Sequence, residues 1–267
     1  MNFKFFQIQR FFNRIKWKLS NVNEKTYESF IENIDSARHP EVKTIDETID
    51  VLTNKKKSIA RYGDGEYFLC FGRNIGFQHK DKTLQKRLIE VLTTPNPNCL
   101  IGIPEFRKNR LTYFWKQFWF ENFKLVTKLL NPKITYFNQS ISREINLEQI
   151  KSLSQLWENK HVVFVTGKGS RFNPEHEIFK NVSSYDCVYG QPKNAWQDYN
   201  RLLNEITEKA GVTETIVILA IGPTATILAY DLSNIKNVQA IDIGHITNVY
   251  DKIVYGTENP EKLPYSI

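Results

Sequence analysis

The sequence predicts an α/β protein built on a mostly parallel, Rossmann-like sheet with helices on both faces. Seven short runs are apolar and rich in β-branched residues, and they lack the polar–apolar alternation of a half-exposed strand. Helical stretches separate most of these runs, and such an alternation of strands and helices is typical of parallel sheets. The expected strands are 58–62, 99–104, 134–137, 161–165, 185–188, 215–221 and 238–243.

Helices are expected in the stretches between these strands. Leu84, Leu88 and Leu92, for example, recur at helical spacing. The aromatic stripe of 111–130 is interpreted as core because large aromatic residues are mostly buried, with a sugar-binding acceptor groove as the alternative. The expected helices are 44–52, 83–92, 111–130, 147–159, 196–209 and part of 21–43, which ends at a proline.

The composition is that of a soluble globular protein. The chain has 267 residues, of which 41% are hydrophobic and 24% charged, enough to bury a sizeable core. Cys70, Cys99 and Cys187 are widely spaced, which argues against a disulfide framework or zinc site and fits a reducing, cytoplasmic compartment. No apolar run reaches the roughly 18 residues of a membrane span. The net charge of +7 favours anionic partners such as phosphates, nucleotides and acidic lipids.

Residues 1–20 form a basic amphipathic segment that we separate from a single predicted domain over 21–267. The segment is rich in Phe, Lys and Arg and contains no acidic residue. Two interpretations stay open: a helix that contacts an anionic membrane at its inner face, or a helix that packs on the domain. The positive charge elsewhere is scattered, so we expect no nucleic-acid partner.

The strand 58–62 ends in a turn that carries two carboxylates, Asp64 and Glu66, flanked by Gly63 and preceded by Arg61. Carboxylates two residues apart on a tight turn can converge on one hard cation such as Mg²⁺ or Mn²⁺. The alternative is that these acids cap the following helix, where Asp and Glu are favoured.

A second polar loop follows the strand 161–165. Gly167, Gly169 and Ser170 offer backbone amides, and Lys168 and Arg171 offer positive charge, which together suit a diphosphate. The spacing is neither that of a Walker A loop nor that of a GxGxxG fingerprint. Ligands of parallel sheets bind beyond the carboxyl ends of the strands, so this loop and the acid pair are expected at one edge.

Three more strand ends contribute to that edge. Lys193 and Asn194 follow the strand 185–188 and could reach phosphate, ribose or base, with an ordinary helix cap as the alternative. His245 follows the strand 238–243 and is a metal ligand, an orienting group or a structural residue. After the strand 215–221 comes an anion site at a helix start, made of Gly222, Pro223, Thr224 and Thr226. Together these loops describe a metal-bridged nucleotide diphosphate site.

The ordered set of motifs resembles the GT-D-fold glycosyltransferases, a bacterial family. The resemblance runs from Ser58 to Tyr250. The motifs that carry it are Arg61-Tyr62-Gly63-Asp64-Gly65-Glu66, Ile101-Gly102-Ile103-Pro104, Ile141-Ser142-Arg143, Gly167-Lys168-Gly169-Ser170-Arg171-Phe172, Pro192-Lys193-Asn194-Ala195, Gly222-Pro223-Thr224-Ala225-Thr226 and Ala240-Ile241-Asp242-Ile243-Gly244-His245.

This resemblance implies a metal-dependent hexosyltransferase. The donor would be a UDP-sugar, UDP-glucose among them, and the acceptor a saccharide or lipid-linked saccharide in cell-surface polysaccharide or glycoprotein biosynthesis. Mn²⁺, or Mg²⁺, would be held by Asp64 and Glu66 of the D-x-E motif, and His245 would complete the site. Lys168 and the stretch 173–176 depart from the family pattern, which bears on sugar specificity. The expected donor-binding residues are Arg61, Gly63, Gly167, Gly169, Ser170, Arg171, Lys193, Asn194, Gly222, Pro223, Thr224 and Thr226.

Two other function classes stay open at this point. One is a metal-dependent phosphoesterase, which usually needs more acids around its metals than this edge supplies. The other is a non-catalytic module that binds nucleotides or a membrane surface. For a transferase, Glu105 and Asp242 are candidate general bases, and the sequence does not choose between them. The sugar, the acceptor, the stereochemical course and any homo-oligomer are also left open.

Overall fold

The computed structural model describes residues 24–108, 111–210 and 213–257. These residues form two compact units. The described parts of 1–39 and 106–128 make up the smaller unit, and those of 40–105 and 129–267 the larger one. The basic segment 1–20 lies outside the described residues, so its predicted helix stays a prediction.

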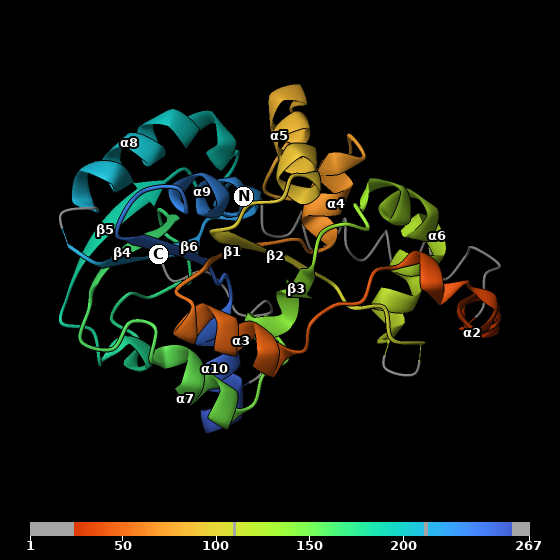
Figure 1. Cartoon of the computed structure of the whole chain (residues 1–267), viewed down its shortest axis with the longest axis horizontal. Coiled ribbons are helices and arrows are strands. Elements are labelled where there is room, and N and C mark those ends of the chain that lie inside the picture. Colours follow the sequence, from red (N-terminus) through yellow and green to blue (C-terminus); the bar gives the residue numbers. More distant parts are fainter. Residues whose placement is uncertain (1–23, 109–110, 211–212, 258–267) are drawn as a thin grey trace, which may run out of the picture. The chain divides into compact units, whose positions relative to one another are not determined.

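The larger unit contains a seven-stranded sheet in which every pairing is parallel (Figure 1). The strand order is β3-β2-β1-β7-β6-β4-β5. The strands are β1 (Ser58–Arg61), β2 (Cys99–Ile103), β3 (Tyr136–Asn138), β4 (His161–Gly167), β5 (Ser184–Gly190), β6 (Thr215–Ala220) and β7 (Val238–Asp242). The predicted parallel α/β sheet is thereby confirmed, and each expected strand is present.

Helices cover both faces of this sheet (Figure 1). One face carries α4 (Asp64–Cys70), α5 (Lys82–Thr93), α8 (Tyr199–Lys209) and α9 (Pro223–Leu232). The other face carries α3 (Ile45–Asn54), α7 (Leu147–Ser154) and α10 (Ile246–Tyr255). Apart from the edge strand β5, which exposes Tyr185 and Tyr189, the strands are largely buried, which explains why their sequences lack alternation.

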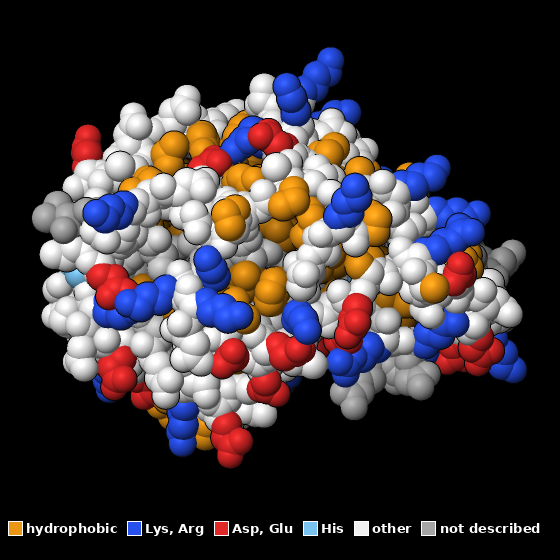
Figure 2. All heavy atoms as spheres, viewed as in Figure 1, with side chains coloured by type: hydrophobic (Ala, Val, Ile, Leu, Met, Phe, Trp, Pro, Cys, Tyr) orange, Lys and Arg blue, Asp and Glu red, His pale blue; other side chains and the backbone are white. Residues whose placement is uncertain are grey.

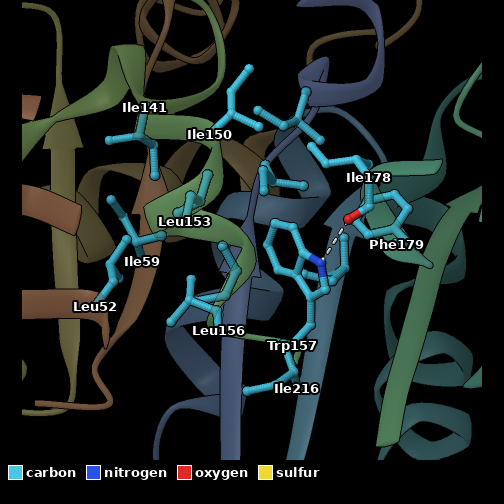
Figure 3. Packing of buried hydrophobic residues seen from close by; sticks show 14 of the residues in the cluster. Leu52, Ile59, Ile141, Ile150, Leu153, Leu156, Trp157, Ile178, Phe179 and Ile216 are labelled. Carbon is cyan, nitrogen blue, oxygen red and sulfur yellow. Dashed lines mark hydrogen bonds between the residues drawn. The ribbon is translucent and has the colours of Figure 1, made fainter. Parts of the chain in front are cut away.

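The second of these faces is sealed by a continuous apolar cluster (Figure 3). Trp157, which follows α7, is fully buried in it and donates its indole N–H to the carbonyl oxygen of Ile178 at 3.0 Å. The single polar group of this large side chain is therefore satisfied inside the core.

Two predicted helices are shorter than expected. The predicted helix 147–159 stops at Ser154, and Asn159 adopts a left-handed backbone with φ +56. The predicted helix 196–209 begins as α8 at Tyr199, because a 3₁₀ turn, η5 (Ala195–Asp198), comes first. Tight turns of this kind are frequent at helix starts, and apolar periodicity alone does not reveal them.

The smaller unit contains α2 (Glu24–Asn33) and α6 (Tyr113–Leu129). The core interpretation of the aromatic stripe is confirmed for Phe118, Trp119 and Phe123, which are almost fully buried. Phe106 packs edge-on against Trp119 with ring centroids 5.3 Å apart. Among the described residues, no helix is both long and apolar enough to span a bilayer.

Candidate active site

The sheet topology brings the predicted loops to one edge. The strands β1, β7, β6, β4 and β5 are consecutive neighbours and all run in the same direction. Their carboxyl ends therefore lead into the acid pair, His245, the Gly222 turn, the Gly167 loop and Asn194 in spatial succession. All of these residues belong to the larger unit.

The acid pair lies on the first turn of α4. Gly63 precedes the helix, Asp64 is its first residue, and both carboxylate-bearing residues are half-buried. An Oε2 atom of Glu66 accepts a hydrogen bond from the backbone N–H of Gly63 at 2.8 Å. The capping interpretation is thus correct for one oxygen of Glu66. Because a carboxylate has two oxygens, this cap leaves the Glu66 side chain with further acceptor capacity.

The pKa of Glu66 is raised from 4.5 to about 7. Burial is the main cause, the negative charges of Asp242 and Asp64 add to the rise, and the hydrogen bond from the Gly63 N–H opposes it. An ionised Glu66 is therefore held in an environment that disfavours its charge. A divalent cation bound at this carboxylate would remove that penalty.

The chemistry of the donor set fits Mn²⁺ or Mg²⁺, which prefer carboxylate oxygens and complete their shells with water and substrate phosphate. Asp64 and Glu66 would supply two such ligands. Within the described part of the chain, however, no three His, Cys, Asp or Glu side chains are gathered as a metal cluster. His245 is exposed, and its Nδ1 lies 3.4 Å from Nδ2 of Asn248. Asp64, Glu66 and His245 are thus not gathered as a three-ligand cluster, and the role of His245 as a third ligand stays a prediction.

The guanidinium of Arg61 is buried and bonded within the protein. Its Nη1 donates to the carbonyl oxygen of Gln139 at 3.0 Å and also bonds to Ser142 Oγ, while its Nη2 forms an ion pair with Asp242 at 3.1 Å. Arg61, predicted as a donor-binding residue, is thus a buried link between β1, β7 and the turn after β3. A Cβ atom on Gly244, where φ is +52, would lie 2.8 Å from this Nη2.

Asp242, one of the two candidate bases, is the ion-pair partner of Arg61. It is only 6% exposed, and besides the ion pair it accepts a hydrogen bond from the backbone N–H of Arg61 at 3.2 Å. Burial raises its pKa, and the positive charge of Arg61 opposes the rise. A buried, ion-paired carboxylate cannot reach an acceptor hydroxyl. Glu105, the other candidate, is half-buried just beyond the carboxyl end of β2.

The Gly167 loop is accessible but offers fewer amides than expected. Lys168, Gly169 and Ser170 are exposed, and Gly169 has φ +72 with open space around its Cα. The N–H of Lys168 donates to the carbonyl oxygen of Gly190, and that of Ser170 donates to Gly167, both at 2.9 Å. Two of the loop's amides are therefore used within the protein. Arg171 is half-buried at the end of the loop.

The Gly222 turn opens α9 as predicted, but its hydroxyls face inward. Gly222 is exposed with φ +60, and Pro223 occupies the first helical position. Thr224 and Thr226 are fully buried, so neither side chain lines the edge. Thr226 donates its hydroxyl to the carbonyl oxygen of Arg61 at 2.9 Å, whereas Thr224 Oγ1 has no hydrogen-bond partner.

Phe77 lies beside Asn194 at this edge and was not predicted from the sequence. Lys193 is exposed as expected, but the Oδ1 atom of Asn194 accepts the backbone N–H of His79 at 2.8 Å. The N–H of Asn194 donates to the carbonyl oxygen of Phe77, also at 2.8 Å. Asn194 thereby fastens the loop between α4 and α5 to this edge. The Phe77 ring of this loop is half-exposed, and nothing in the sequence set Phe77 apart from the other apolar residues of the loop, Phe71 and Ile75.

All of the loops at this edge lie within the part of the chain that is similar to known proteins. The family model described as "Glycosyltransferase GT-D fold" matches residues 59–266. The "Probable glycosyl transferase Gly" of Streptococcus gordonii is 28% identical over an alignment of 243 residues, which covers 85% of this chain and 35% of that protein. The "Glycosyltransferase GlyD" of Streptococcus pneumoniae serotype 4 is 25% identical over 240 residues, or 84% of this chain and 29% of that protein.

A solved structure shares the fold. It is described as "A New Glycosyltransferase (DUF1792) from Streptococcus sanguinis", with a TM-score of 0.74 and 26% identity over 82% of this chain and 86% of that one. The chain spans about a third of the length of the curated relatives that it matches, since it covers 35% and 29% of them.

Proposed function

This chain belongs to the glycosyltransferase GT-D fold family, and we propose that it transfers a hexose from a UDP-sugar to a saccharide or lipid-linked saccharide acceptor. The observation that carries the proposal is the acid pair on the first turn of α4, at the carboxyl end of β1 and inside the span that the family model matches. Acids at this edge lie where ligands of parallel sheets bind.

In this proposal Asp64 and Glu66 hold Mn²⁺ or Mg²⁺ against the donor diphosphate. The cation would neutralise the charge that develops on the leaving nucleoside diphosphate. The raised pKa of Glu66 supports this assignment, because a divalent cation would compensate its buried charge. His245, exposed at the end of the adjacent strand β7, would orient the donor or become a third ligand after a movement of its ring.

The flexible cations of the edge would hold the phosphates. Lys168 and Lys193 are exposed, and Arg171 is half-buried, on loops that follow the neighbouring strands β4 and β5. The Gly222 turn supplies the start of α9, where the helix dipole favours an anion. Arg61 is not among these phosphate-binding residues, because its guanidinium bonds to Gln139 and Asp242 inside the protein.

The test is sugar transfer from radiolabelled UDP-sugars in the presence of Mn²⁺. We expect transfer, or slow donor hydrolysis, by the wild type and its loss in Asp64→Asn and Glu66→Gln, which keep the shape but remove charge. Glu208→Gln is the matched control, since Glu208 is an exposed acid on the last turns of α8. Equal activity of all four proteins would contradict the assignment of the acid pair.

The two other function classes give different results in the same assay. A phosphoesterase would release phosphate from simple phosphoesters, and the lack of a three-acid cluster among the described residues speaks against it. A binding module would bind UDP without turnover on any acceptor.

We further propose that residues 1–20 attach the protein to the cytoplasmic face of an anionic membrane, where a lipid-linked acceptor would be met. The support is the acid-free, aromatic and basic composition of this segment. Elsewhere, acidic and basic side chains are interspersed over the face seen in Figure 2. Equal co-sedimentation of the full chain and a version lacking residues 1–20 with anionic vesicles would refute the attachment.

A further inference from the structure

Phe77 is an exposed aromatic residue that the roles assigned so far do not use. It lies in the loop between α4 and α5, and 49% of its surface is exposed. Its neighbour in sequence, Gln78, is only 4% exposed. The loop therefore buries a polar side chain and presents an apolar ring, the reverse of what solvation alone favours.

The backbone at Phe77 and just after it is hydrogen-bonded to the segment that follows β5. Asn194 receives the N–H of His79 on its side-chain oxygen and gives its own N–H to the carbonyl oxygen of Phe77, each at 2.8 Å. Asn194 does so in the left-handed region, at φ +54. The N–H of Trp196 adds a bond to Oε1 of Gln78 at 3.4 Å. These bonds hold Phe77 in one place before any ligand arrives.

The ring rests on the turn that opens α9. A Cβ atom on Gly222 would lie 2.8 Å from Cε2 of Phe77, and the φ of +60 at Gly222 also favours glycine. The close approach therefore depends on glycine at this position. One part of the ring contacts the turn, and the exposed remainder faces solvent at the carboxyl edge of the sheet.

The distance along the edge between the acid pair and Phe77 suggests which part of the donor would contact the ring. Only β7 separates β1, which leads to the acid pair, from β6, which leads to Gly222. Two strand spacings amount to about 10 Å. In a nucleotide sugar, the transferred sugar is attached to the metal-bound phosphate and so stays near Asp64 and Glu66. The base lies at the other end, beyond the ribose, and is a planar group that stacks on aromatic rings.

We propose that Phe77 is the stacking platform for the nucleobase of the donor, an inference that rests on the proposed function. Stacking on the ring would bury its exposed apolar surface and contribute to affinity for any base, since every base has a π-face. Asn194 is then a positioning residue that holds the platform.

The test compares UDP with inorganic pyrophosphate, both titrated calorimetrically in the presence of Mn²⁺. Phe77→Leu keeps an apolar side chain on Gly222 but removes the π-face, whereas Phe77→Trp keeps it. We expect Phe77→Leu to weaken UDP binding about tenfold, to leave pyrophosphate binding unchanged, and Phe77→Trp to bind UDP like the wild type. Tyr255→Ala is the control, because Tyr255 is 59% exposed on the last turn of α10.

The possible results distinguish a failure of this inference from a failure of the proposed function. Wild-type affinity for UDP in Phe77→Leu overturns the platform and leaves the donor class standing. Equal weakening of UDP and pyrophosphate also overturns it, because the ring would then act only by supporting the Gly222 turn. If the wild type binds no UDP at all, both the proposed donor and the platform are wrong.

Discussion

At the scale of single residues, Thr224 and Thr226 show how two similar side chains can have opposite energetic roles. Both are fully buried on the first turns of α9. The hydroxyl of Thr226 bonds to the carbonyl oxygen of Arg61, whereas that of Thr224 has no partner. A buried hydroxyl without a hydrogen bond destabilises the folded state.

Thr224→Val is therefore expected to raise the free energy of unfolding by about 1 kcal/mol, and Thr226→Val to lower it by about 1–2 kcal/mol, because only the second loses a bond. Urea denaturation of the two variants measures the difference. UDP affinity should not change in Thr224→Val. A marked loss of affinity there would restore the sequence-based interpretation that Thr224 lines the phosphate pocket.

The ion pair between Arg61 and Asp242 is the other residue-scale feature with a large expected effect. The two side chains are 10% and 9% exposed. Asp242→Asn leaves the guanidinium buried without its counter-charge, so we expect the free energy of unfolding to fall by about 3 kcal/mol. Denaturant titration checks this value.

The combination of Asp242→Asn with Arg61→Gln distinguishes a pair from two independent contacts. Because neither charge then remains, the double variant should lose clearly less stability than the sum of the single losses. Strict additivity would show that the two side chains are not coupled.

At the scale of elements, the first turns of two helices hold carboxylates that cap them. The two acids of α4 begin a helix, and one of them caps it. At α3, Thr44 and Glu47 form a reciprocal capping box: the N–H of Glu47 bonds to Thr44 Oγ1 at 3.1 Å, and that of Thr44 to Glu47 Oε2 at 2.8 Å. The Thr44 N–H, followed by Lys43, lowers the pKa of Glu47 from 4.5 to about 2.

A lowered carboxyl pKa makes the contribution of this cap depend on pH. The ionised form is favoured in the folded state, so its stabilising effect is present above pH 4.5 and is lost as the pH falls towards about 2. The urea midpoint of Glu47→Gln should therefore lie below that of the wild type at neutral pH and approach it in acid. Glu208→Gln serves as the control. A gap that stays constant over this range would contradict the assignment.

At the scale of the whole molecule, the sheet and the proposed metal site are energetically separate. The core is formed by a seven-stranded sheet between two helical layers, whereas the acid pair occupies one helix start at the edge. A chelator is therefore expected to leave the thermal midpoint of the ligand-free protein unchanged and to abolish the stabilisation by UDP with Mn²⁺. Thermal unfolding with and without EDTA provides the measurement. Unfolding of the ligand-free protein by EDTA would instead indicate a structural metal.

The sequence by itself determined the fold class, the strands and the edge at which the loops meet. Apolar runs without alternation have few alternatives to a covered parallel sheet, and parallel strands must end at the same edge. It also placed the acid pair correctly beyond β1. These features depend on local pattern and on topology, both of which are written along the chain.

Only the tertiary structure decided which of those side chains are exposed at the edge and which are bonded inside the protein. Arg61 and Asp242 are 181 positions apart, and their ion pair buries a predicted donor-binding residue together with a candidate base. Thr224 and Thr226 turn inward, and Phe77 reaches the edge through contacts with Asn194 and Gly222. The reason is physical: a charge or hydroxyl at a strand end takes whichever partner the packed chain brings near, and sequence spacing does not encode that partner.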